Sequence, residues 1–179
     1  MRQRLNQAVQ ALLWLVGLSC VVNYALRPDM EYGRMLALTG QVSVAMLVLA
    51  LGASAPALRR SLPQLLRSRR TLGLGMFGFA VLHTGVYLHR KGVEGSLEPE
   101  LLTGWIALAL AVPLAITSTD RAVRRMGPRW RKLHAWSWAV AILSLLHAAL
   151  TAYDPLLWWG ALTVLMVVRL RRRILRRNS

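Results

Sequence analysis

The sequence predicts an all-α membrane protein, a bundle of six transmembrane helices with both chain termini in the cytoplasm. Three observations lead to this prediction: 55% of the 179 residues are hydrophobic, the formal net charge is +16, and the basic residues lie between long apolar stretches. A basic soluble domain, such as a nucleic-acid binder, rarely carries so much apolar surface. We therefore expect the chain to contact membrane lipid and no nucleic acid.

Six apolar segments define the predicted spans. The first five are 18 to 22 residues long, and about 20 residues of helix cross the hydrocarbon core of a bilayer. The sixth has only 14 residues and would span with local thinning of the bilayer and with its arginines reaching for the headgroups. We expect one transmembrane domain over residues 1–179 with a basic cytoplasmic tail at 169–179. The segments are 8–26, 33–54, 72–89, 101–118, 133–153 and 155–168.

The first segment has a second interpretation. Residues 2–20 combine a basic start, an apolar run and Gly-Leu-Ser-Cys at positions 17–20, a pattern faintly similar to a cleaved or lipidated signal. The apolar run continues to Leu26 without a clear small-residue cleavage site, which favours an uncleaved span. Cys20 is the single cysteine of the sequence, which excludes an internal disulfide and a cysteine-based zinc or iron–sulfur site.

The basic residues predict the orientation of the spans, since Lys and Arg collect on the cytoplasmic side of a membrane. With a cytoplasmic N-terminus, 19 basic residues fall in the cytoplasmic segments and 4 in the outer ones. Of the seven acidic residues, only Asp120 falls in a cytoplasmic segment. The third and fifth spans then run outward, from the cytoplasm to the periplasm.

The third span contains the pattern G-x-G-x-x-G at Gly73, Gly75 and Gly78. A dinucleotide-binding fold needs a buried strand before the first glycine, and the preceding residues, LPQLLRSRR, are too basic for one. We interpret Gly75, Gly78 and the nearby Ala80 as packing positions, where a neighbouring helix or a large flat ligand approaches the backbone closely.

Two histidines within the spans are the main functional candidates, because ionisable residues are costly in a bilayer. His83 lies 13 residues beyond Arg70, and His147 lies 15 residues beyond Lys132. At about 1.5 Å of rise per residue, the two imidazoles lie level to within roughly 3 Å, in the outer half of the bilayer. Two neutral imidazoles bind iron well and leave no open axial position, which favours electron transfer. We predict that His83 and His147 are the axial ligands of one haem iron.

The alternative is that each histidine only forms a hydrogen bond with a neighbouring span. A histidine that ligates a metal usually holds its other ring nitrogen on an acceptor, and backbone carbonyls, Thr84 and Ser144 are candidates for this role. Zinc is disfavoured, since no third cysteine, histidine or carboxylate lies at the same predicted depth.

The remaining histidines lie elsewhere. His134 is two residues past Lys132, about 3 Å from the cytoplasmic edge of the fifth span. It could ligate a second haem, bind a quinone oxygen or contact a flavin phosphate beside the neighbouring basic residues; the alternative is an interfacial histidine among lipid headgroups. His89, six residues after His83, lies on another face near the outer surface, and we expect no function there.

Several stretches together resemble one known family. They are RRTLGLGMFGFAVLHTGVYL at 69–88, LAITS at 114–118, RRMGPRWRKLHAWSWAVAILSLLH at 124–147 and Thr-Gly at 39–40. This combination is similar to the MsrQ (YedZ) family of haem-binding membrane subunits, within the ferric-reductase-like transmembrane superfamily. The arginine pair, the two Leu-His pairs and the spacing of the last two histidines make the pattern specific.

The resemblance implies a bacterial inner-membrane subunit that holds haem b, with flavin mononucleotide (FMN) as a further cofactor. Such a subunit takes electrons from quinol and passes them to a periplasmic molybdenum-containing subunit that reduces methionine sulfoxide in proteins. The family's three histidines fall on His83, His134 and His147. The chain would then be an electron-transfer subunit of an oxidoreductase system and not a complete enzyme.

The chain departs from the family pattern at three places. PELLTGW at 99–105 stands where the family usually has R-P-Y, and Ser-Ala-Pro at 54–56 stands where it has T-P. The wider superfamily often has a further histidine where this chain has Arg70. Two other functions stay open: a stand-alone transmembrane reductase of ferric or other metal ions, fed by a soluble cytoplasmic flavin reductase, and a cofactor-free basic membrane scaffold.

Overall fold

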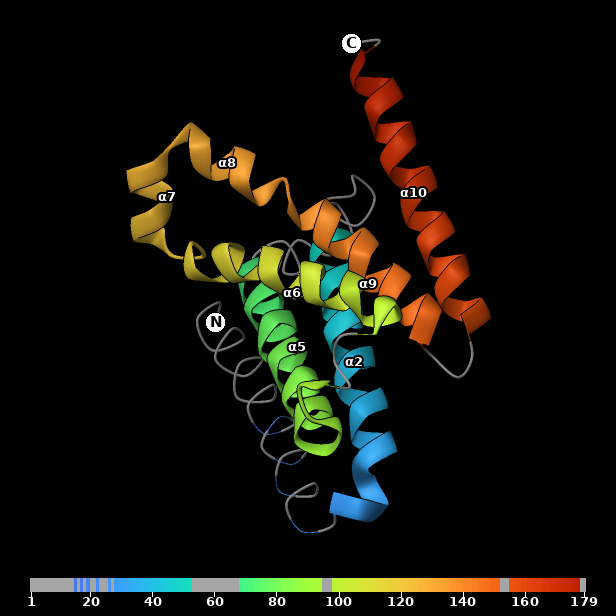
Figure 1. The fold of residues 1–179 in the computed structure, drawn as a ribbon. Helices are drawn as coiled ribbons and strands as arrows, with labels where there is room; N and C mark the ends of the chain where they lie inside the picture. Colours follow the sequence, from blue (N-terminus) through green and yellow to red (C-terminus); the bar gives the residue numbers. More distant parts are fainter. Residues whose placement is uncertain are drawn as a thin grey trace.

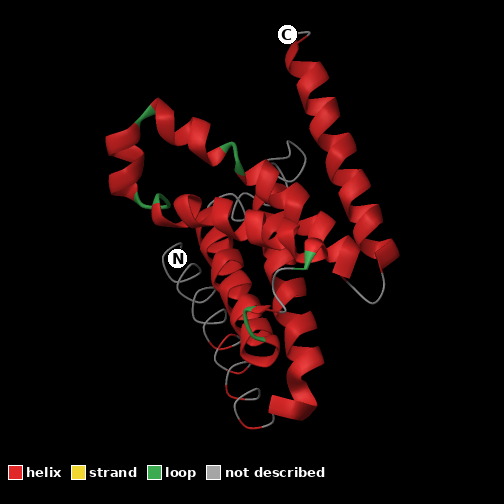
Figure 2. Cartoon of the chain, in the orientation of Figure 1, coloured by secondary structure: helices red, strands yellow, loops and turns green. Residues whose placement is uncertain are grey.

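A computed structural model describes residues 28–52, 68–94, 98–151 and 155–177, together with the isolated residues 15, 17, 19, 22 and 26. Every regular element in this described part is a helix, and it contains no strand (Figure 2). The predicted all-α class is therefore confirmed. The helices are α2 (Pro28–Gly52), α5 (Arg69–Lys91), α6 (Pro99–Ile116), α7 (Asp120–Met126), α8 (Pro128–His134), α9 (Ser137–Thr151) and α10 (Pro155–Arg177).

Four predicted spans coincide with stretches that are long and apolar enough to cross a membrane. The second to fifth predicted spans correspond to Tyr32–Gly52, Arg69–Lys91, Pro99–Ile116 and Pro128–Thr151. The first predicted span, 8–26, lies outside the described residues except for isolated positions. The sixth forms the start of α10, whose apolar part, Pro155–Val167, is shorter than these spans. The count of six spans and the cytoplasmic location of both termini stay predictions.

The fifth predicted span is not one continuous helix, contrary to the sequence interpretation. α8 ends at His134 and α9 begins at Ser137. The backbone tightens between them, since the Trp136 amide donates to the Leu133 carbonyl at 3.0 Å and the Ser137 hydroxyl donates to the His134 carbonyl at 2.8 Å. His134 and His147 therefore lie on separate helices.

The described helices pack mainly as two pairs, α2 against α5 and α6 against α9, with α10 against α9. In Figure 1, α7 and α8 project at one end of the bundle between α6 and α9, and α10 extends from α9 to the C-terminus. The Ser43 hydroxyl donates to the Met76 carbonyl at 3.0 Å, and the Arg69 side chain donates to the Ala50 carbonyl at 2.9 Å. These two bonds join α2 to α5 at the level of the core.

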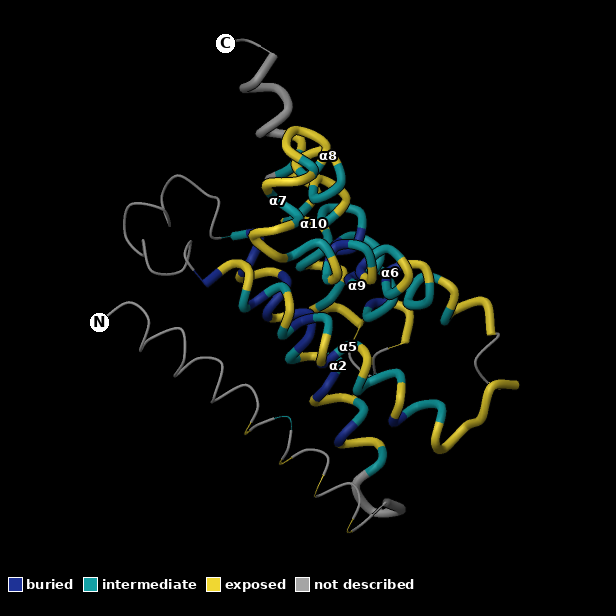
Figure 3. The backbone as a smooth tube through the Cα atoms, turned by 90° about the vertical axis from the view of Figure 1, so that its left-hand side faces the viewer, coloured by how far each residue is buried: buried dark blue, intermediate teal, exposed yellow. Residues whose placement is uncertain are grey.

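The buried core lies where the two pairs meet (Figure 3). Large apolar side chains also cover the outside of the bundle, as expected for helices that face lipid; examples are Leu49, Val81, Ile106 and Leu150. The core cluster comprises Met46, Leu47, Ala50, Leu51, Leu72, Met76, Phe79, Ala111, Leu114, Val140 and Ala141.

Candidate functional site

A cavity of about 940 Å³ lies among α2, α5, α6 and α9, with residues of α10 at its margin. This volume is in the range of pockets that hold organic ligands and cofactors. Residues from both helix pairs line it, including the two histidines predicted as ligands; those used below are Gly40, His83, Thr84, Gly104, Ser144 and His147.

The two cavity histidines lie side by side. The centres of the His83 and His147 rings are 6.2 Å apart, and the ring planes make an angle of 83°. A metal–imidazole nitrogen bond is about 2 Å long and a ring nitrogen lies about 1 Å from the ring centre, so two imidazoles on one metal ion have centres roughly 6 Å apart. The spacing of His83 and His147 therefore fits axial ligation of a single iron.

The second ring nitrogen of His83 is held by the backbone of α2. Nδ1 lies 2.9 Å from the Leu36 carbonyl oxygen and 3.5 Å from the Thr39 hydroxyl. Because a carbonyl only accepts, Nδ1 carries the proton and Nε2 is the nitrogen with a free lone pair. A backbone carbonyl thus takes the role proposed for the acceptor, whereas the Thr84 hydroxyl donates to the Ala80 carbonyl of its own helix at 3.0 Å.

His147 is held less completely. The Glu100 carbonyl is the backbone acceptor that acts on its ring, yet the buried Nδ1 atom makes no hydrogen bond with any described residue. Ser144 lines the cavity one turn below His147. An unsatisfied buried nitrogen in a cavity is what a ring that adjusts to a ligand would leave.

Glycines give both rings their space, although not the glycines that we singled out. A Cβ atom at Gly40 would lie 3.1 Å from His83 Nδ1, and one at Gly104 would lie 3.0 Å from His147 Nδ1. In contrast, a Cβ at Gly78 would meet nothing within 4 Å. The packing role predicted for Gly78 is wrong, because this residue is exposed on the outside of α5.

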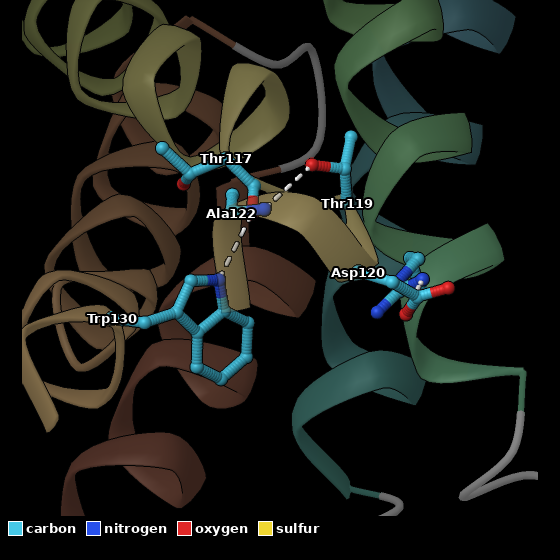
Figure 4. A network of polar contacts seen from close by, with 6 residues as sticks. Thr117, Thr119, Asp120, Ala122 and Trp130 are labelled. Carbon is cyan, nitrogen blue, oxygen red and sulfur yellow. Dashed lines mark hydrogen bonds and ion pairs between the residues drawn. The ribbon is translucent and has the colours of Figure 1, made fainter. Parts of the chain in front are cut away.

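The structure keeps His134 apart from the cavity. Its ring stacks on Trp130 with centres 3.9 Å apart, and Nε2 lies 3.0 Å from the Thr117 hydroxyl. The Trp130 indole donates to the Thr117 carbonyl at 2.9 Å (Figure 4). His134 therefore belongs to a separate polar cluster at the junction of α6, α7 and α8.

Charged residues lie beside that cluster. Thr119 caps α7 by accepting from the Ala122 amide at 3.1 Å, and the next residue, Asp120, pairs with Arg70 of α5 at 2.8 Å (Figure 4). His89 lies exposed in the last turn of α5 and does not line the cavity. The roles of His83, His134 and His147 in cofactor binding stay predictions.

A repeat in the sequence could have revealed Gly104, which our sequence interpretation missed. Leu-Thr-Gly occurs at 38–40 and again at 102–104, and Leu-His occurs at 82–83 and again at 146–147. Both recurrences are 64 residues apart. The same offset relates Leu36 to Glu100, whose carbonyls act on the two histidine rings.

Comparisons with known proteins agree with this architecture. The family described as "Ferric reductase like transmembrane component" matches residues 36–145, a stretch that includes His83 and His134 and ends just before His147. A protein-methionine-sulfoxide reductase heme-binding subunit MsrQ from Yersinia pseudotuberculosis serotype O:1b is 39% identical over 118 residues. These residues are 61% of this chain and 58% of the relative.

The MsrQ subunit from Yersinia pestis strain Pestoides F is also 39% identical over 118 residues, which are 61% of this chain and 57% of the relative. The chain thus spans less than two thirds of the length of these relatives. No solved structure matches it significantly. The family match covers more than half of the chain and agrees with the resemblance in its motifs, so the chain belongs to the ferric-reductase-like transmembrane family and is similar to its MsrQ subunits.

Proposed function

We propose that the chain is an electron-transfer subunit of the bacterial inner membrane that binds haem b through His83 and His147. The single observation that supports this best is the 6.2 Å separation of the two rings within one cavity. Haem with two histidine ligands supplies a one-electron centre without an open axial position. The relatives named as heme-binding subunits support the same cofactor.

The chain's own residues would hold the group and keep it dry. His83 and His147 offer Nε2 to the iron, while the Leu36 carbonyl accepts from His83 Nδ1 and raises the basicity of that ligand. The cavity walls are mainly apolar side chains from four helices, such as Met76, Leu108 and Val140. Such walls exclude water and favour outer-sphere electron transfer.

The proposed partners follow from the names of the relatives. The electron acceptor would be a periplasmic molybdenum-containing reductase that repairs methionine sulfoxide, because the relatives are subunits of protein-methionine-sulfoxide reductase. The donor would be quinol, which dissolves in the bilayer that the helices cross. We place its reaction, or that of FMN, near His134, where Trp130 offers an aromatic surface and α7 and α8 carry several basic side chains.

The direct test is the visible spectrum of the purified full chain before and after reduction. We expect the spectrum of low-spin haem b in the wild type and the loss of most of it in His83→Ala and in His147→Ala, since each change removes one axial ligand. His89→Ala is the matched control, because this histidine does not line the cavity, and its spectrum should equal that of the wild type. A wild-type chain without haem would refute the proposal.

A stand-alone ferric or metal reductase is the second candidate, favoured by the description of the matching family. Inverted membrane vesicles separate the two functions. Quinol should reduce the haem without NADH if the chain serves a periplasmic reductase. Reduction that requires NADH and a soluble flavin reductase would favour the stand-alone function.

A further inference from the structure

Each cavity histidine lies against a glycine of the helix that pairs with its own. His83 of α5 faces Gly40 of α2, where a Cβ would lie 3.1 Å from Nδ1 and 3.2 Å from Cε1. His147 of α9 faces Gly104 of α6, where a Cβ would lie 3.0 Å from the same two ring atoms. Even one methyl group at either glycine would force the ring to move by a few tenths of an ångström.

A threonine precedes each glycine and contacts the carbonyl that faces the ring. The Thr39 hydroxyl donates to the Met35 carbonyl at 2.7 Å and lies 3.2 Å from the Leu36 oxygen, with its own oxygen 3.5 Å from His83 Nδ1. Thr39 is only 1% exposed. In the other pair, the Thr103 hydroxyl lies 3.4 Å from the Glu100 oxygen.

We propose that Gly40 and Gly104 are positioning residues for two haem ligands, and that Thr39 tunes the ligand on its side. This inference rests on the proposed haem function. Each glycine forms a slot in which one imidazole lies flat against a neighbouring helix, with Nδ1 directed at a backbone carbonyl and Nε2 left for the iron. The two slots are equivalent members of the 64-residue repeat, so one device holds both rings.

Thr39 has a separate effect through His83. Because its hydroxyl hydrogen is used by Met35, its oxygen is a second acceptor that faces the proton on His83 Nδ1. Acceptors at this position make the imidazole a stronger donor to iron and stabilise the ferric state. Removal of the hydroxyl should therefore raise the midpoint potential of the haem.

The first experiment compares glycine substitutions in the full chain, purified in detergent and reconstituted with haemin. We expect Gly40→Ala and Gly104→Ala each to convert low-spin into high-spin haem and to lose haem to apomyoglobin several-fold faster than the wild type. Gly78→Ala and Gly85→Ala are matched controls on the His83 helix, since a Cβ at either meets nothing within 4 Å. Both controls should keep the wild-type spectrum and rate.

The second experiment keeps the proposal testable if a glycine variant folds poorly. Thr39→Val keeps the shape of the side chain and removes the hydroxyl, whereas Thr39→Ser keeps the hydroxyl. We expect a redox titration to give a raised midpoint potential for Thr39→Val and the wild-type potential for Thr39→Ser. A merely structural role of Thr39 would not separate these two variants.

The outcomes distinguish this inference from the function on which it rests. A wild-type chain that shows no low-spin haem overturns both. If the wild type and the His89→Ala control bind low-spin haem, and the Gly40→Ala and Gly104→Ala variants behave as Gly78→Ala does, the positioning role is overturned and the haem function stands. Equal potentials in Thr39→Val and the wild type would overturn the tuning role of Thr39.

Discussion

At the scale of single residues, depth along a helix was predictable from sequence and ring orientation was not. The level positions of His83 and His147 follow from helix rise and from the basic residues at the cytoplasmic edge. Which ring nitrogen is free depends on contacts across helices, such as the 2.9 Å bond from His83 to the Leu36 carbonyl. Gly40 and Gly104 escaped notice for the same reason, since only the packed structure reveals their nearness to the rings.

His134 is the residue whose role differs most from that of the cavity pair. It stacks on Trp130 and contacts Thr117, outside the cavity that holds the other two histidines. We expect His134→Ala to keep the low-spin haem spectrum while slowing reduction of that haem by a quinol analogue in stopped-flow measurements. A variant that loses the low-spin spectrum, together with a His147→Ala variant that retains it, would mean that His83 pairs with His134.

At the scale of elements, hydropathy predicted the helices of the described part better than it predicted their ends. The second to fourth spans agree with α2, α5 and α6 because an apolar stretch in lipid must satisfy its backbone as a helix. The break at 135–136 was not predictable from composition, since the residues from Leu133 to Trp138 are apolar on average. It arises from local bonds such as that from the Ser137 hydroxyl to the His134 carbonyl.

Gly127 joins α7 to α8 and is a testable element of this region. Its φ of 51° and ψ of −124° are accessible mainly to glycine, and its carbonyl accepts from the Trp130 amide at 3.2 Å. We expect Gly127→Ala to cost about 1 to 3 kcal/mol locally and to change the tryptophan fluorescence near His134.

Gly85→Ala is the control for Gly127→Ala, because Gly85 is helical and a Cβ there meets nothing within 4 Å. The outer haem should keep its spectrum in both variants. If Gly127→Ala leaves both the melting temperature and the fluorescence of the wild type unchanged, the strained junction does not position Trp130.

At the scale of the whole molecule, two helix pairs each contribute one histidine and one glycine slot to a shared cavity. A second cluster of aromatic, polar and basic residues lies at the α6–α8 junction, on the side where the sequence concentrates positive charge. The separation of these clusters suits transfer of electrons across part of a membrane. Its direction depends on how the helices are oriented, which the charge distribution predicts.

Reporter fusions test that orientation and the role of α10. A reporter inserted near residue 61 or fused after residue 179 should be active in the cytoplasm, and one inserted near residue 95 should be active in the periplasm, because 19 of the 23 basic residues then lie inside. The apolar part of α10, Pro155–Val167, covers only about 20 Å at 1.5 Å per residue, against roughly 30 Å of hydrocarbon. α10 can therefore cross only where the bilayer thins or the arginines of its last turns reach the headgroups. A cytoplasmic signal after residue 179 with a periplasmic signal near residue 95 would mean that it does cross, whereas a periplasmic signal after residue 179 would mean that α10 lies on the outer surface.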